Sequence, residues 1–263
     1  SVGPIRGYVI RAGYRGMSSE TGRHVVSICL SKDGDARFLG HLDFGRLVDR
    51  SLRRSALPVR HTQGFNPRLS LSYTDALPVG MASEGEWIQV RITQDLDPVD
   101  VQAMLAPALP EAVRLVDVCK GPPPEVGPVV RYRLEVLDGW RSATDALTAL
   151  LERDSYTVED RRRKTPVEVR SMLADARADG SALLVDLHAG GPSAPRPGPV
   201  ARALEELAAA QGGPPLAFGA FTKLRSGECR PGEDDTWQDD AVVAAEGRPA
   251  SSSSIPVRPR RAG

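Results

Sequence analysis

A proline-rich stretch near the middle of the chain, Gly121-Pro-Pro-Pro-Glu-Val-Gly-Pro128, limits what the sequence can fold into. Proline has a fixed φ and no backbone N–H donor, so the stretch suits neither the interior of a helix nor a central strand. We expect it to act as a stiff linker. The chain has 263 residues, more than one ordinary domain, and each side of the linker is long enough to bury its own core. The sequence therefore predicts two domains, at 23–120 and 129–228, joined by a linker at 121–128.

Both ends of the chain lack hydrophobic periodicity. Residues 1–22 are rich in Gly and Arg, whereas residues 229–263 are first acidic, then Ser-rich, and carry several Arg residues near their end. Such segments cannot bury enough apolar surface to offset the entropy lost on ordering. We therefore predict a disordered leader at 1–22, with Met17 as a candidate natural start, and a disordered tail at 229–263.

Hydrophobic spacing predicts strands and helices in a similar order on both sides of the linker. In the first half the expected strands are 24–30, 36–39, 59–61, 69–73, 87–92 and 114–118, and the expected helices are 43–56 and 98–108. In the second half the expected strands are 131–137, 156–161, 167–173, 182–188 and 216–224, and the expected helices are 143–152 and 200–211. This order indicates an α+β fold of two tandem ferredoxin-like (split βαβ) domains. The fold serves RNA binders, metal carriers and enzymes alike, so it does not by itself indicate a function.

The charge is balanced overall but uneven along the chain. The 34 Lys and Arg residues match 34 Asp and Glu residues, which argues against a protein that coats nucleic acid or a membrane by bulk charge. Residues 37–72 nevertheless hold seven Arg, two Asp and no Lys. In the helix expected there, Asp43 is a plausible N-cap, and four arginines share the polar face: Arg46, Arg50, Arg53 and Arg54. Guanidinium groups at this spacing can follow phosphates, although a solvated face in an Arg-rich chain has the same pattern.

The segment Gln63-Gly-Phe-Asn-Pro-Arg68 combines turn residues with an aromatic ring. A turn built on Gly, Asn and Pro does not need a ring for its backbone geometry. Phe65 beside Asn66 and Arg68 can form a surface on which a nucleic-acid base stacks and accepts or donates hydrogen bonds. The alternative is that Phe65 folds back and anchors its own loop.

Two further groups of residues could carry chemistry. His41 follows Arg37 and precedes the expected helix, where an imidazole can act as a general acid or base, although a single His in this position is often structural. Ser83-Glu84-Gly-Glu86 places two carboxylates two residues apart, hence on one side of an extended chain. We expect Glu84 and Glu86 to pair with Arg37 or Arg68, to bind a cation, or simply to be solvated.

The sequence indicates neither a metal nor a cofactor. Its three cysteines are far apart, and neither they nor the histidines have the spacing of a zinc site or an iron–sulfur cluster. No apolar run approaches the length of a membrane span, and no signal-peptide pattern is present. We therefore expect a cytoplasmic protein that does not contact a membrane.

The motifs of residues 37–86 resemble a radical-SAM-linked family of bacterial proteins. That family's domain has no known function and also occurs as a C-terminal extension of cobalamin-binding radical SAM proteins. Its pattern of Arg-Phe-Leu, His-Leu-Asp, Gln-Gly-Phe-Asn-Pro and Ser-Glu-Gly-Glu falls here at Arg37, His41, Asp43, Gln63, Phe65, Asn66, Pro67, Ser83, Glu84 and Glu86. The resemblance is dense over 25–92, is looser to about 225, and departs at 68–72. It implies an association with a separately encoded radical SAM partner.

Three functions follow as hypotheses. The first is a non-catalytic accessory protein that binds RNA, or presents substrate, for a radical SAM partner, because the chain lacks CxxxCxxC and every recognised catalytic motif. In this hypothesis Arg37, the arginines of the helix and Arg68 contact phosphates while Phe65 stacks on a base. The second is an endoribonuclease-like enzyme that uses His41, by analogy of fold. The third is a protein–protein adaptor whose loop motif is the partner interface.

Overall fold

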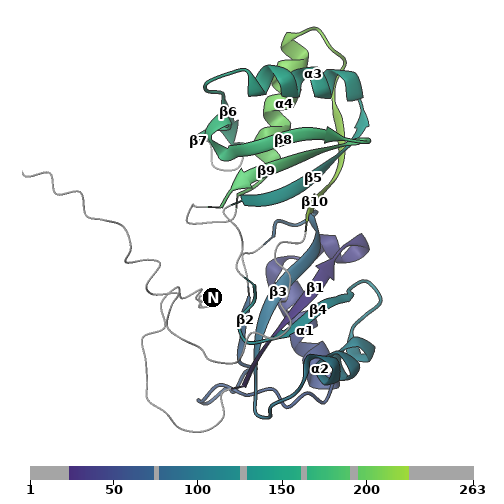
Figure 1. The fold of residues 1–263 in the computed structure, drawn as a ribbon, viewed down its shortest axis with the longest axis vertical. Helices are drawn as coiled ribbons and strands as arrows, with labels where there is room; N and C mark the ends of the chain where they lie inside the picture. Colours follow the sequence, from purple (N-terminus) through teal and green to yellow (C-terminus); the bar gives the residue numbers. More distant parts are fainter. Residues whose placement is uncertain (1–23, 74–76, 125–128, 161–164, 190–194, 225–263) are drawn as a thin grey trace, which may run out of the picture. The chain divides into compact units, whose positions relative to one another are not determined.

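A computed structural model of the chain describes residues 24–73, 77–124, 129–160, 165–189 and 195–224 (Figure 1). The predicted leader and tail lie outside the described residues, as do the end of the predicted linker at 125–128 and a basic run at 161–164.

The first half has the order strand–helix–two strands–helix–strand. Its strands are β1 (His24–Lys32), β2 (Leu71–Tyr73), β3 (Ala82–Ile92) and β4 (Leu115–Lys120), and its helices are α1 (His41–Arg54) and α2 (Pro98–Leu105). Short 3-10 helices, η1 (Gly34–Phe38) and η2 (Ala106–Ala108), precede α1 and follow α2. All pairings are antiparallel and the strands run in the order β4-β1-β3-β2. This is the ferredoxin-like arrangement, in which each helix connects two strands that flank a third.

The second half repeats this topology with an insertion. Its sheet has the antiparallel order β10-β5-β9-β8, formed by β5 (Val129–Asp138), β8 (Leu173–Asp179), β9 (Ala182–His188) and β10 (Ala217–Lys223). Its helices are α3 (Trp140–Leu151) and α4 (Gly198–Ala210), which lie on one face of this sheet in Figure 1. Between α3 and β8 a separate hairpin of β6 (Thr157–Asp160) and β7 (Thr165–Glu168) is followed by the 3-10 helix η3 (Arg170–Met172).

Each half has its own hydrophobic core. In the first, alternate residues of β1 such as Val26 and Ile28 pack with the apolar stripe of α1, which includes Phe44, Val48 and Leu52. The second core is formed by β5, β9, α3 and α4. Alternation along a strand and a helical period near 3.6 residues are what place these side chains on one face. The prediction of an α+β, ferredoxin-like fold is confirmed.

The two halves meet through their strands. β10 pairs in parallel with the start of β3, at Thr222↔Ala82 and Lys223↔Ser83, so the described strands on this path form one continuous sheet. Leu77 and Met81, which precede β3, pack in the core of the second half. The predicted linker begins attached to β1, because the Gly121 N–H donates to the carbonyl of Val25 at 2.8 Å. The division into two separate domains stays a prediction.

Several predicted boundaries were wrong. Helix α1 begins at His41 with Gly40 as its N-cap, so Asp43 lies in the first turn and does not cap it. Residues 36–38 of the expected extended piece at 36–39 belong to η1, and only Leu39 is extended. The expected strand 59–61 contributes only isolated bridges, Val59↔Ile92 and His61↔Leu69. The strand expected at 167–173 is divided between β7 and η3, and the hairpin partner of β9 is β8.

Among the described residues, no helix has both the length and the apolar character needed to cross a membrane.

Candidate functional site

Two charged residues occupy the core face of the first sheet. Leu30 of β1 pairs with Glu86 of β3, and Lys32 pairs with Ser83. Paired residues on neighbouring strands point to the same face, as do residues two apart along one strand. Lys32 and Glu86 therefore lie on the face that Leu30 contributes to the core, and both are buried.

A β-bulge in β3 determines how Glu86 is placed. Two steps along β1, from Leu30 to Lys32, correspond to three steps along β3, from Glu86 to Ser83. The extra residue breaks the alternation of the strand, so Glu84 is exposed whereas Glu86 is buried. The expectation that Glu84 and Glu86 share one side of the chain was therefore wrong. The bulge also lets the buried Ser83 hydroxyl donate to Oε1 of Glu86 at 2.6 Å.

Glu86 is the link between the two halves at this point. Its Oε1 lies 3.1 Å from Nζ of Lys223, the last residue of β10, and both side chains are about nine-tenths buried. The expected partners, Arg37 and Arg68, do not take this position. A buried carboxylate must be paired to be tolerated, and Lys223 and Ser83 provide that pairing.

Lys32 differs from the other described lysines in its surroundings. It is only 2 % exposed and donates no hydrogen bond to any described residue. Burial lowers its pKa below the usual value, because an ammonium loses solvation in the protein interior, and nearby Glu86 opposes this only in part. The protein interior therefore disfavours the ammonium form of Lys32 relative to a lysine in water.

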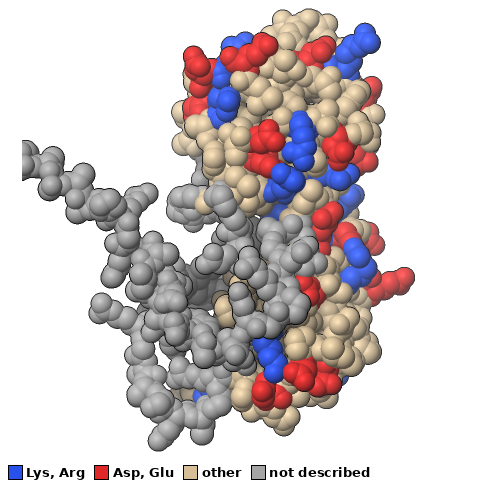
Figure 2. All heavy atoms as spheres, in the orientation of Figure 1, with Lys and Arg blue, Asp and Glu red and all other residues tan. Residues whose placement is uncertain are grey.

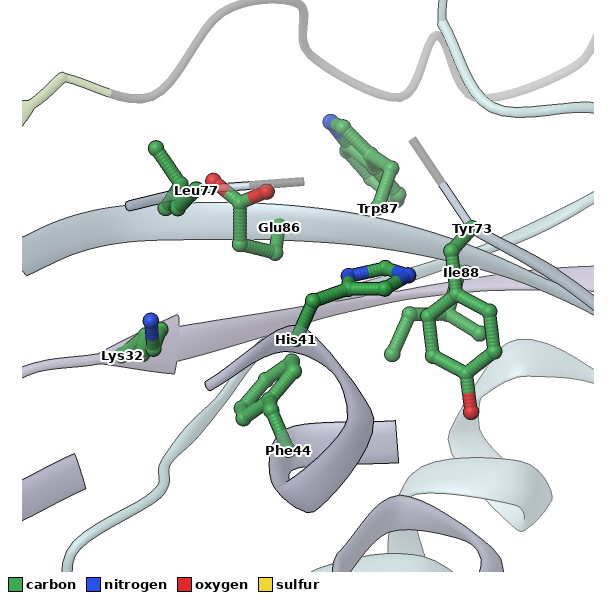
Figure 3. A pocket seen from close by; sticks show the side chains of 8 residues that line it. All are labelled: Lys32, His41, Phe44, Tyr73, Leu77, Glu86, Trp87 and Ile88. Atoms are coloured by element: carbon green, nitrogen blue, oxygen red, sulfur yellow. The ribbon is translucent and has the colours of Figure 1, made fainter. Parts of the chain in front are cut away.

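Lys32 and Glu86 line a narrow pocket beside the start of α1. Figure 3 shows its lining, with His41 lying between Glu86 and Tyr73. The His41 and Tyr73 rings meet edge to face with centroids 5.7 Å apart, and the remaining lining residues are Lys32, Phe44, Leu77, Trp87 and Ile88. The free space is about 20 Å³, room for about one water molecule. Among the described residues, no three His, Cys, Asp or Glu side chains form a group that could hold a metal ion.

The loop at 62–68 projects from the molecule and is closed at its base. The Thr62 N–H donates to the carbonyl of Arg68 at 2.8 Å, and the Arg68 N–H donates to the Thr62 hydroxyl at 3.1 Å. Phe65 at its tip is fully exposed, so it does not fold back to anchor the loop. Gln63, Asn66 and Arg68 are also exposed.

Most of the predicted arginine face of α1 is engaged within the protein. Arg46 pairs with Asp43 at 3.0 Å, Arg53 pairs with Asp49 at 2.8 Å, and Arg54 donates to the carbonyl of Ala108 at 2.6 Å. Of the four, only Arg50 has no polar partner among the described residues. On the face shown in Figure 2, Lys and Arg residues are interspersed with Asp and Glu.

Arg37 precedes the pocket-lining His41 in the chain but does not itself line the pocket. Its carbonyl accepts a hydrogen bond from the Gly80 N–H at 2.8 Å, and its guanidinium stacks 4.7 Å from the centre of the exposed Phe38 ring. The structure thus brings His41 and Glu86 together in one pocket and leaves the 62–68 loop as a separate surface.

Sequence reasoning missed Lys32, Tyr73 and Lys223. A signal was present, because the chain has only four Lys among its 34 basic residues. Lysine can lose its charge when buried, whereas arginine cannot. In so Arg-rich a chain, a Lys at the end of a strand is therefore an informative choice.

The strand order and connections define an α+β protein with two ferredoxin-like halves. The sequence model of one protein family, described as an uncharacterized protein conserved in bacteria (DUF2344), matches residues 26–197. The chain belongs to this family.

Comparison with solved structures gives only weak likenesses. One is the small subunit of acetolactate synthase from Thermotoga maritima, with 12 % identity, a TM-score of 0.23, and coverage of 80 % of this chain and 99 % of that one. Another is an unknown protein from Galdieria sulphuraria, with 14 % identity, a TM-score of 0.23, and coverage of 75 % and 97 %. At these TM-scores neither likeness informs fold or function. No curated protein matches the chain significantly.

Proposed function

We propose that this chain is a cytoplasmic accessory protein that binds RNA through its 62–68 loop on behalf of a radical SAM partner. The observation that carries the RNA-binding role is the fully exposed Phe65 ring at the tip of a closed loop. A Phe side chain gains roughly 1.5–3 kcal/mol on full burial. Phe65 gains none of this from the residues that the structure describes, so its apolar face is available to a ligand.

Charge around the loop favours RNA over a protein as this ligand. Between Asp49 and Asp75 the sequence has no acidic residue, and Arg60 and Arg68 are both exposed. Arginines beside an aromatic ring combine phosphate contacts with base stacking. The association with a radical SAM partner is supported only by the motif resemblance of residues 37–86.

The endoribonuclease alternative is less well supported by the geometry. His41 is half-buried, packs against Tyr73, and faces a pocket with about 20 Å³ of free space. A phosphodiester does not fit in such a space without movement of the lining.

The test is a binding assay with fragmented total RNA, measured by fluorescence anisotropy. We expect Phe65→Ala to weaken binding by roughly tenfold, since stacking contributes about 1–3 kcal/mol per base. Arg68→Ala should lower the slope of log K against log salt by about one phosphate contact. Arg46→Ala is the matched control, because Arg46 is exposed but paired with Asp43, and it should change little.

Absence of RNA binding would refute the proposal. An affinity for RNA that changes neither with salt nor with Phe65→Ala would also refute it. A partner protein that stays bound after nuclease treatment and is lost with Phe65→Ala would favour the adaptor hypothesis.

A further inference from the structure

We propose that Lys32 is a reactive amine that captures a small neutral aldehyde as a Schiff base in the pocket that it lines. The proposal goes beyond RNA binding and does not depend on it, because the 62–68 loop contributes no residue to the pocket.

The first support is the position of Lys32. Its side chain is 2 % exposed and lines a cavity, and it donates no hydrogen bond to a described residue. An ammonium on so buried a side chain loses solvation, and the nearby charge of Glu86 offsets this loss only in part. Glu86, which could neutralise it, already accepts hydrogen bonds from Lys223 and Ser83.

The second support is that a neutral lysine is a nucleophile. Burial shifts the pKa of Lys32 downward, with Glu86 opposing the shift. Lysines desolvated in this way form Schiff bases with carbonyl compounds. Lys120 on β4 is the opposite case within the same chain, since Asp95 and Asp97 each lie 3.0 Å from its Nζ and raise its pKa.

The third support is that acid–base groups share the pocket with Lys32. Nζ would attack the carbonyl carbon and form a C–N bond as the carbonyl oxygen becomes a hydroxyl. Loss of that hydroxyl as water, with the proton lost from nitrogen, gives the imine, so amine plus aldehyde equals imine plus water. His41 and Glu86 line the same pocket and are the groups that can carry these protons.

The pocket also limits the class of aldehyde. Its free space of about 20 Å³ admits only a small molecule, and Phe44, Leu77 and Ile88 provide apolar walls. The Glu86 carboxylate in the lining would repel an anionic substrate. A neutral aldehyde of a single carbon therefore fits the size and the chemistry of the pocket best.

The experiment is reductive trapping of the full-length protein with formaldehyde and cyanoborohydride, followed by peptide mapping. Each trapped imine adds one methyl group to a lysine. At about pH 7.5 we expect Lys32 to be labelled faster than Lys120, because burial lowers the pKa of Lys32 and leaves more of it as free amine, whereas hydrogen bonds to Asp95 and Asp97 raise the pKa of Lys120. The pH profile of Lys32 labelling should rise at a lower pH than that of Lys120.

Labelling of Lys32 that is equal to or slower than labelling of Lys120 would overturn the proposal, as would a Lys32 profile that rises at the same pH. Both measurements use the unaltered protein, so loss of folding in a variant cannot explain the result. RNA plays no part in the assay, so its outcome is independent of the proposed RNA binding.

Discussion

The Glu168 carboxylate accepts hydrogen bonds from three backbone N–H groups. The N–H groups of Tyr156, Arg170 and Ser171 donate to it at 2.7, 3.1 and 2.6 Å. Hydrogen bonds to the ionised carboxylate favour that form. A hydrogen bond with the Ser171 side chain is the largest cause, and together with the backbone N–H groups it lowers the pKa of Glu168 from 4.5 to about 2. The Glu168 side chain thus links the residue before β6 to the first two residues of η3.

We predict that Glu168 stabilises the protein in a pH-dependent way. A carboxyl whose pKa is depressed by folding stabilises the native state above its unfolded pKa and loses that effect as pH falls through the folded value. The Glu168 contribution should therefore be complete above about pH 5 and fade between 4.5 and about 2. Relative to wild type, Glu168→Gln should lose about 1–2 kcal/mol of unfolding free energy at neutral pH, after allowance for solvent screening.

Urea denaturation of both proteins across this pH range measures the effect. The difference between wild type and variant should shrink as the solution becomes more acidic. A difference that stays constant with pH would show that the Glu168 carboxylate is not the responsible group.

At the scale of elements, the end of α1 carries a local backbone cost. Ser55 is the C-cap, and the next residue, Ala56, has a φ of 57°. This left-handed conformation is common at the residue after a helix C-cap but is normally filled by glycine, because a Cβ crowds the neighbouring carbonyl. Ala56 is exposed, so its methyl group gains little from packing in return.

We predict that Ala56→Gly stabilises the protein by about 0.5–1 kcal/mol, the amount by which relief of strain exceeds the added chain entropy of glycine. The measurement is the urea midpoint at unchanged m-value. Ala103→Gly in α2, also exposed but within a helix, is the control and should destabilise by about 1 kcal/mol. Destabilisation by both changes would contradict the assignment of strain at Ala56.

The presence of helices and strands could be predicted more reliably than the residues at which they begin and end. The stripe of Phe44, Val48 and Leu52 indicated α1 correctly, because packing on one face requires a period near 3.6 residues. Its start was placed at Asp43 from the capping preference of aspartate, yet Gly40 fills that position. Capping preferences are worth only about 1 kcal/mol, so tertiary contacts around the start of α1 can outweigh them.

At the scale of the whole molecule, the Lys223–Glu86 pair lies where β10 joins β3. We predict that Lys223→Met destabilises the protein by about 3 kcal/mol, the low end for breaking a buried pair, because Ser83 still donates to Glu86. The double variant Lys223→Met with Glu86→Gln should recover a large part of that loss, since no unpaired buried carboxylate remains.

Thermal unfolding of the two variants and wild type measures this coupling. Lys120→Met is the matched control, since Lys120 is also ion-paired but its partners Asp95 and Asp97 are exposed, and it should change stability little. Equal losses in the single and double variants would mean that the ion pair does not connect the two halves energetically.

The sequence by itself determined the α+β class, the order of elements in the first half and the 62–68 loop, because these depend on periodicities and turn residues that are local. It did not reveal the pocket. The β3 bulge separates Glu84 from Glu86, and pairing of β10 with β3 brings Lys223 to a carboxylate 137 residues away. Strand register and the pairing of distant strands are decided by the burial of whole faces, so only the tertiary structure could place Lys32, His41 and Glu86 together.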